Sequence, residues 1–135
     1  AFGSTVAVRD APQAATSDAV LAAEPFSAAR LAELRAAGKP VFVYFTADWC
    51  ITCKVNERGA LADADVTAAF TSAGVTTLVG DWTRPDAAIS AYLASQGRSG
   101  IPLYQFYGPD GRIQTLPQLL TPGMLAGLVA PGDSA

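Results

Sequence analysis

The chain has only two cysteines, Cys50 and Cys53, and they lie in the segment Trp49-Cys50-Ile51-Thr52-Cys53. This segment comes shortly after the apolar run 41–45. A cysteine pair at this spacing, where a strand gives way to a helix, is typical of a dithiol that cycles between thiols and a disulfide. Because both cysteines belong to the pair, none is left for a separate structural bridge. We therefore expect the chemistry of the chain to be concentrated at this pair.

The two cysteines are expected to play different roles. Cys50 falls in the first turn of the predicted helix, where unpaired backbone N–H groups and the helix dipole favour a thiolate. We therefore predict that Cys50 is the attacking nucleophile. Cys53 lies one turn later on the same face and is more sheltered, so we predict that it resolves a mixed disulfide formed on Cys50.

Several neighbouring side chains are candidates for assisting this chemistry. Glu57 lies four residues after Cys53 on the same helical face, where its carboxylate would help to move a proton; the alternative is an ordinary solvated charge. Trp49 is either a flat apolar contact that shields the sulfurs and meets a partner, or a core aromatic at a strand end. Asp48 and Lys54 flank the pair and are candidates for tuning the thiolate, although exposed charges usually contribute little.

The composition indicates one globular domain whose partners are proteins. With 135 residues, of which 50% are apolar, the chain is long enough to bury about 70% of its unfolded surface without a staple. The net charge of −3 and the scattered Lys and Arg residues argue against a nucleic-acid partner. No apolar stretch approaches the roughly 20 residues of a membrane span. We expect the isolated domain to be a monomer.

The elements that must position the cysteine pair can be predicted from the pattern of apolar and capping residues. Residues 1–25 show no sustained apolar period and are interpreted as a tether or linker, followed by a domain at 26–130 and a tail at 131–135. Ser27 and Asp63 are predicted helix caps. The predicted helices are 27–37, from 50 to the break at Gly59, 63–73, 85–96 and 121–129, and the predicted strands are 41–46, 75–80, 103–107 and 112–116.

The order of these elements predicts an α/β protein with the thioredoxin fold, in which helices flank a central mixed four-stranded sheet. A parallel crossover comes first and an antiparallel hairpin last. In such a fold Pro102 would be cis and would face the dithiol, and its neighbour Ile101 would pair with an extended substrate segment. The alternative is an ordinary turn proline, because only about 5–6% of X-Pro bonds are cis.

The segment Phe-Thr-Ala-Asp-Trp-Cys-Ile-Thr-Cys-Lys-Val-Asn-Glu at 45–57 resembles the active site of a known family. It is similar to the C-terminal thioredoxin-like domain of the DsbD disulfide reductases. Asp81-Trp82-Thr83, Gly100-Ile101-Pro102 and Pro109-Asp110-Gly111 fit the same template, so the resemblance runs from about residue 26 to residue 129. Thr52 and the segment 55–57 resemble more closely the ScsB branch, which is linked to suppression of copper sensitivity.

This resemblance implies a periplasmic domain of a bacterial inner-membrane protein that acts as a protein-disulfide reductase, with a redox-active disulfide and no other cofactor. A transmembrane domain of the same protein would deliver electrons, and an N-terminal periplasmic domain or other periplasmic thiol proteins would receive them. Residues 1–25 would be the connection. The chain departs from the family at Tyr44, where many relatives have a buried Asp six residues before the first cysteine. Proton handling would then fall to Glu57 or to the Tyr44 hydroxyl.

A soft-metal binding module is the alternative from another functional class, because a C-x-x-C at a helix start also binds such metals. The chain has no His and no further Cys, so a four-ligand zinc site cannot be built within it. Cu(I) held by both thiolates is left open, although Trp49 and Pro102 favour the redox interpretation. An oxidase would use the same scaffold, but Ile51-Thr52 lacks the His that oxidases usually carry there. We therefore predict a reductase relay.

Overall fold

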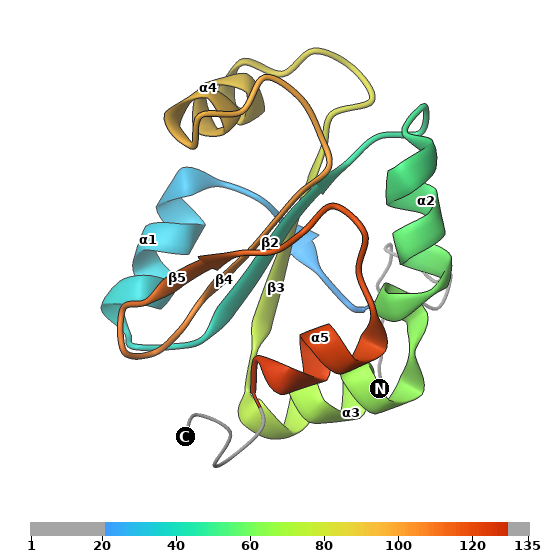
Figure 1. Ribbon diagram of the computed structural model, residues 1–135. Helices are drawn as coiled ribbons and strands as arrows, with labels where there is room; N and C mark the ends of the chain where they lie inside the picture. The colour runs from blue at the N-terminus through green and yellow to red at the C-terminus, as the bar shows by residue number, and fades with distance from the viewer. Residues whose placement is uncertain (1–20, 130–135) are drawn as a thin grey trace, which may run out of the picture.

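The computed structural model describes residues 21–129. A five-stranded mixed sheet with the strand order β1-β3-β2-β4-β5 forms its centre, and helices cover both faces (Figure 1). The predicted α/β architecture is confirmed. In chain order the elements are β1 (Glu24–Pro25), α1 (Ala28–Ala36), β2 (Val41–Thr46), α2 (Ile51–Arg58), the 3₁₀ helix η3 (Ala60–Ala62), α3 (Ala64–Ala73), β3 (Thr76–Asp81), α4 (Ala87–Ser95), β4 (Leu103–Tyr107), β5 (Ile113–Thr115) and α5 (Pro122–Gly127).

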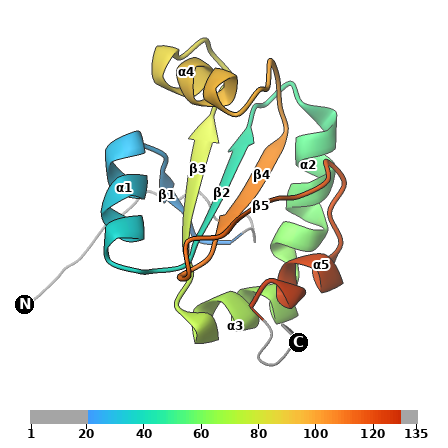
Figure 2. The same cartoon turned by 60° about the vertical axis from the view of Figure 1, so that its left-hand side comes forward.

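The strand that leads into the cysteine pair, β2, is the middle strand of the sheet. It pairs in parallel with β3 and antiparallel with β4, and all six of its residues are buried. Figure 2 shows β3, β2 and β4 side by side, with α2 following the end of β2. A near-continuous apolar run such as 41–45 suits this position, because a central strand is covered on both faces.

The two faces of the sheet carry separate hydrophobic cores. Val41, Val43 and Phe45 of β2 pack with buried residues of α1 and α4. Phe42 and Tyr44 point to the other face and pack with η3, α3 and α5. This division follows from the alternation of side chains along a strand. It places Tyr44 on the face of the sheet that α3 and α5 cover (Figure 1).

The helices begin where the capping residues predict. The side chains of Ser27 and Asp63 accept hydrogen bonds from backbone N–H groups in the first turns of α1 and α3. Asp86 and Thr121 do the same for α4 and α5. Such caps satisfy donors that have no partner within the helix. The predicted strands at 41–46 and 103–107 are confirmed at both ends.

The prediction of four strands is wrong by one, because β1 adds a fifth strand at the edge of the sheet beside β3. Glu24 and Pro25 pair with β3, and Leu21 is buried in the core that contains α3. Folded structure therefore begins before the predicted boundary at residue 26. A strand of two residues carries no periodic signal. The rest of the predicted tether, 1–20, and the predicted tail lie outside the described residues.

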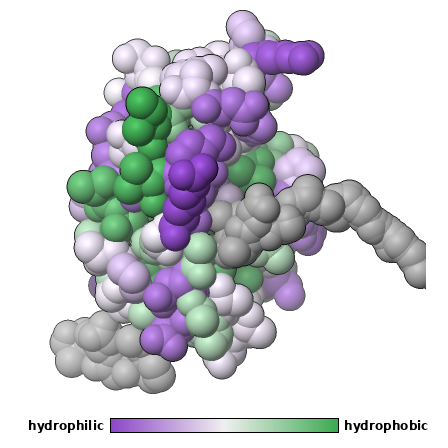
Figure 3. Space-filling view, turned by 90° about the vertical axis from the view of Figure 1, so that its right-hand side faces the viewer, coloured by the Kyte–Doolittle hydropathy of each residue, from purple (hydrophilic) through white to green (hydrophobic). Residues whose placement is uncertain are grey.

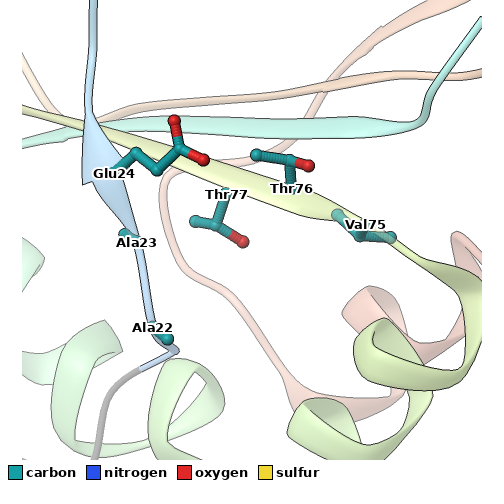
Figure 4. Close-up of a pocket in the computed structure, with 6 residues that line it drawn as sticks. All are labelled: Ala22, Ala23, Glu24, Val75, Thr76 and Thr77. Atoms are coloured by element: carbon teal, nitrogen blue, oxygen red, sulfur yellow. The ribbon is translucent and has the colours of Figure 1, made fainter. Parts of the chain in front are cut away.

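A cleft of about 350 Å³ separates the segment before β1 from the start of β3, because the two strands pair over only two residues each. Figure 4 shows its lining, with Glu24 on one side and Thr76 and Thr77 on the other. The cleft lies at the start of β3, whereas the cysteine pair follows the end of the parallel neighbour β2. It is therefore separate from the site described next.

Candidate functional site

Cys50 and Cys53 form a disulfide at the N-terminal end of α2, with their Cα atoms 5.3 Å apart. Cys50 is the N-cap residue of the helix, and its Sγ accepts a hydrogen bond from the backbone N–H of Cys53 at 3.2 Å. The predicted position, between a strand and a helix, is confirmed. Unpaired N–H groups and the positive end of the helix dipole lie at this end, and they favour a thiolate on Cys50 once the disulfide is reduced.

The two cysteines differ in their access to solvent. Cys50 is 7% exposed, whereas Cys53 is fully buried. The Sγ of Cys53 lies 3.9 Å from the backbone carbonyl oxygen of Phe45, near the end of β2. Cys50 is therefore the cysteine that the sulfur of a partner protein can reach first. This order agrees with the predicted roles, which stay predictions.

The peptide bond between Ile101 and Pro102 is cis, as the sequence predicts. It lies directly before β4, and Pro102 is buried. Ile101 packs against the small cluster formed by Ala47 and the two cysteines. The proline loop and the dithiol therefore lie side by side although they are far apart in the sequence. Pairing of this loop with a substrate stays a prediction.

Trp49 is 59% exposed, so the alternative of a core aromatic is wrong. Its indole N–H donates to the carbonyl oxygen of Thr83 at 3.2 Å, and its ring centroid lies 6.4 Å from that of Trp82. The backbone N–H of Asp48 donates to Thr83 Oγ1 at 2.9 Å. These contacts hold the indole at the surface beside the cysteine pair.

Exposed apolar side chains continue along α2 and the loop before α5. Ile51 is 79% exposed, and Val55 and Leu119 are also exposed. Leu119 lies next to α2 because its two neighbours in the loop hydrogen-bond to the Asn56 side chain. Figure 3 views this side of the molecule and shows hydrophobic side chains gathered beside a hydrophilic ridge. Together with Trp49, these residues give the dithiol a partly apolar border.

The predicted proton-handling residue, Glu57, lies between α2 and the sheet with 16% of its side chain exposed. Its carboxylate accepts hydrogen bonds from the hydroxyl of Thr46, at the end of β2, and from Lys54 Nζ at 3.2 Å. Lys54 Nζ also lies 3.8 Å from an Asp48 carboxylate oxygen. Glu57 is therefore not the freely solvated charge of the alternative interpretation. Its role in proton transfer stays a prediction.

Comparison with known proteins agrees with this arrangement. The profile of the thioredoxin-like family matches residues 22–109, which include the cysteine pair and the cis proline. The chain belongs to the thioredoxin-like family.

Relatives of this thioredoxin-like domain include DsbD proteins. It is 40% identical over 83 residues to thiol:disulfide interchange protein DsbD 1 of Pseudomonas aeruginosa, and this match covers 62% of the chain. It is 34% identical over 92 residues to thiol:disulfide interchange protein DsbD of Escherichia coli K12, and this match covers 68% of the chain. The matched parts are only 14% and 16% of those relatives. Among residues 21–129, no helix is long and apolar enough to cross a membrane.

Solved structures give the same result for the fold. The C-terminal domain of DsbD from Neisseria meningitidis, in its oxidised form, matches with a TM-score of 0.62 and 25% identity. The match covers 79% of this chain and 96% of that domain. The thioredoxin fold is thus confirmed, and the chain is a thioredoxin-like domain homologous to the C-terminal domain of DsbD.

Tyr44 places a phenol in the core on the face of the sheet that α3 and α5 cover. Tyr44 is buried in the core of the α3 and α5 face, and burial, followed by the charge of Glu57, holds the pKa of its hydroxyl well above the usual range. Burial also raises the pKa of Tyr104 to about 12, although its hydrogen bond from Asn56 opposes this shift. Both phenols are therefore neutral near pH 7. The Tyr44 hydroxyl is consequently a poor candidate for a base.

The resemblance included Thr46, Asn56, Trp82 and Thr83, but sequence reasoning assigned none of them a role in the site. The segment 81–83 had a further usable signal, since it follows a predicted strand parallel to β2, and the carboxyl ends of parallel strands meet at one edge of a sheet. The contacts of Asn56 had no such signal. Asn56 is 2% exposed and hydrogen-bonds to Tyr104 and to the loop before α5, which only the folded chain brings together.

The site offers thiol chemistry. A cleft of about 490 Å³ adjoins it and is lined by polar and charged residues that include Asp48, Asp81 and Arg84. Within residues 21–129, no group of three or more His, Cys, Asp or Glu side chains is arranged to hold a metal ion. Two-coordinate Cu(I) needs only the two sulfurs and is considered below.

Proposed function

We propose that this domain is a thiol–disulfide oxidoreductase that reduces disulfides of other proteins through Cys50 and Cys53. The observation that carries the proposal is the unequal exposure of the two linked cysteines at the N-terminus of α2, beside a cis proline. A redox dithiol needs one sulfur within reach of its partner and a second one held behind it. Relatives named thiol:disulfide interchange protein support the same assignment.

The reaction follows from this geometry. In the reduced domain, the Cys50 thiolate attacks one sulfur of a substrate disulfide, breaks that bond and releases one substrate thiolate. The thiolate of Cys53 then attacks the Cys50 sulfur, which releases the second substrate thiolate and forms the Cys50–Cys53 disulfide. Two electrons have passed from the domain to the substrate. A donor dithiol must reduce the domain again by the same steps in reverse.

The surroundings of the dithiol suit a protein substrate. Trp49 and Ile51 provide exposed apolar contact area next to Cys50. The backbone beside the cis proline, at Ile101, is placed to pair with an extended segment that carries the substrate disulfide. Contacts of this kind distinguish a protein disulfide from a small one.

The place of the domain in a larger protein is part of the proposal. Because the relatives are about six to seven times longer than the matched segment, further domains are expected in the protein. We infer that a transmembrane domain of that protein donates the electrons, and that the recipients are an N-terminal periplasmic domain or other periplasmic thiol proteins. The domain would then be the periplasmic part of a bacterial inner-membrane protein. The likeness of Thr52 and 55–57 to the ScsB branch adds a role in copper tolerance.

The reduction potential of the pair tests the direction of electron flow. The protein is equilibrated with graded ratios of reduced and oxidised dithiothreitol, alkylated, and its free thiols are counted by mass. We expect a value near or below about −220 mV, on the reducing side of protein disulfide isomerase. A value near about −120 mV, as for DsbA, would make the domain an oxidant and overturn the reductase proposal.

Two variants test the roles of the cysteines in the same assay. Cys50→Ser is expected to abolish exchange with a protein disulfide, whereas Cys53→Ser is expected to accumulate mixed disulfides on Cys50, visible by mass. An active Cys50→Ser variant would contradict the mechanism. If the wild-type pair forms no disulfide at any ratio, the Cu(I) alternative replaces the redox proposal.

A further inference from the structure

We propose that Thr46 is a positioning residue for the resolving step, because its hydroxyl holds the Glu57 carboxylate beside Cys53. This inference rests on the proposed thiol–disulfide exchange and assigns a role to a residue outside the C-x-x-C segment. Thr46 is the last residue of β2 and is only 8% exposed. It lies four residues before Cys50 and on the opposite side of the β2–α2 turn from Glu57.

The end of β2 contacts both groups that the resolving step needs. The carbonyl oxygen of Phe45 lies 3.9 Å from Cys53 Sγ, and the hydroxyl of the next residue, Thr46, donates to Glu57 Oε2. On α2, Glu57 follows Cys53 by four residues, which places their Cβ atoms about 5–6 Å apart on one helical face. A single stretch of strand thus contacts both the buried sulfur and the carboxylate.

The two partners of Glu57 hold it from opposite sides. Lys54 Nζ binds Oε1 at 3.2 Å from a side chain that is 36% exposed, and it is shared with Asp48. Thr46 binds Oε2 from the buried side. Within residues 21–129 these are the hydrogen bonds that reach the carboxylate. Losing Thr46 would leave the carboxylate bound only to a partly exposed lysine, which favours its rotation toward solvent.

Other titratable groups near Glu57 do not replace it as a base. Tyr44 on β2 and Tyr104 on β4 feel its charge, and both are phenols whose neutral form is favoured by burial. Arg58, the next residue on α2, is exposed. Glu57 is therefore the carboxylate that is held on the buried side of α2, one helical turn after Cys53.

The proton balance of the resolving step gives Glu57 its task. In the mixed disulfide, Cys53 is a buried thiol and must lose its proton before its sulfur can attack Cys50. The Glu57 carboxylate accepts that proton, the Cys53–Cys50 bond forms, the bond to the substrate breaks, and the substrate leaves as a thiolate. Glu57 then returns the proton to solvent. Attack by Cys50 on the substrate does not need this transfer.

The test separates the two steps by single turnover. Reduced domain is mixed with excess glutathione disulfide between pH 5 and 9, quenched in acid, and the mixed disulfide on Cys50 is counted by mass. Thr46→Val keeps the shape and the β-branched character of the residue but removes the hydroxyl. We expect it to slow resolution about tenfold or more, within the range of acid–base contributions, without slowing formation of the mixed disulfide.

Matched variants decide whether the hydroxyl acts through Glu57. Thr46→Ser restores the hydroxyl and should restore the resolution rate, and Glu57→Gln should resemble Thr46→Val. The double variant should be no slower than Glu57→Gln alone, because both changes remove the same function. Thr77→Val, at a buried threonine on the neighbouring strand, should leave the rate unchanged. Lys54→Met tests the second partner of Glu57 should Thr46→Val fail to fold.

Each result supports or overturns the role of Thr46. Resolution at the wild-type rate in Thr46→Val, or equal slowing in Thr77→Val, would overturn it, because the hydroxyl would then have no special effect. Should Thr46→Val not fold, a normal rate in Lys54→Met and Glu57→Gln would overturn it as well. An absence of mixed disulfide in Cys53→Ser, where no second thiol can resolve it, would instead contradict the proposed exchange itself. The two failures are therefore distinguishable.

Discussion

The exposed residues next to Cys50 are the first that an approaching protein meets. Trp49 is held at the surface by its hydrogen bond to Thr83. Ile51 is 79% exposed, so its apolar side chain buries little surface within the domain. An isoleucine with this exposure contributes little to folding. Its place in the first turn of α2 makes it a candidate for contact with a substrate.

Replacing Ile51 by Ser should weaken reduction of a protein disulfide without affecting reduction of glutathione disulfide. We expect about a tenfold loss in the second-order rate with the protein substrate, as for a moderate contact residue in an interface. Stability should change by less than about 0.5 kcal/mol. The measurement is the rate of exchange with each substrate.

An exposed isoleucine elsewhere provides the control for Ile51. Ile113 lies on β5 opposite Tyr107, which pairs with Val41 at the start of β2 and thus at the other end of the sheet from Cys50. Ile113→Ser should leave both exchange rates unchanged. Equal losses in the two variants, or a loss toward glutathione disulfide in Ile51→Ser, would argue against a substrate contact at Ile51.

At the scale of elements, α2 is attached to the rest of the domain by a buried polar residue. Asn56 donates from Nδ2 to the Tyr104 hydroxyl on β4 and to the carbonyl oxygen of Gln118, each at 2.8 Å. Its Oδ1 accepts from the backbone N–H of Leu120 at 3.0 Å. One side chain therefore joins α2, the sheet and the loop before α5. These bonds satisfy the carbonyl of Gln118 and the backbone N–H of Leu120, which would otherwise be buried without a partner.

Replacing Asn56 by Ala should destabilise the oxidised domain by about 2–4 kcal/mol, because it leaves several buried polar groups without partners. Urea unfolding of the oxidised protein measures this change. Val55→Ala, at the exposed neighbouring position on the same helix, should cost less than about 0.5 kcal/mol. If the two variants were equally stable, Asn56 would not anchor the helix.

At the scale of the whole molecule, buried and half-buried tyrosines on the two faces of the sheet link stability to pH. Burial is the main cause that raises the pKa of Tyr44 and Tyr92 well above the usual range and that of Tyr104 to about 12. In the unfolded chain the same hydroxyls ionise near pH 10. The folded state therefore keeps protons that the unfolded state loses at alkaline pH.

The domain should accordingly lose stability as the pH rises above about 10. The stabilisation is fully present below the unfolded pKa and is lost as the pH rises toward the folded values. The buried Tyr44 and Tyr104 each add up to about 1.4 kcal/mol per pH unit to the decline, and the half-buried Tyr92 adds less. Urea midpoints between pH 8 and 11.5 measure it, and Tyr44→Phe should make the decline shallower. A decline that is equally steep in Tyr44→Phe would show that Tyr44 does not take part.

Short-range patterns in the sequence determined most of the fold. The caps Ser27 and Asp63 marked helix starts, the apolar run 41–45 marked the central strand, and the order of elements indicated the thioredoxin fold. The cysteine spacing identified the dithiol. Patterns of this kind can be read because each depends on residues within one or two turns of one another. The cis state of Pro102 followed from its place in that fold.

Only the tertiary structure decided which other residues surround the dithiol. The bond from Thr46 to Glu57 spans 11 residues, that from Trp49 to Thr83 spans 34, and that from Leu120 to Asn56 spans 64. The edge strand β1 likewise exists because β3 offers it a partner. Such contacts depend on strand register and helix packing, which bring distant segments together and leave no periodic trace in the sequence.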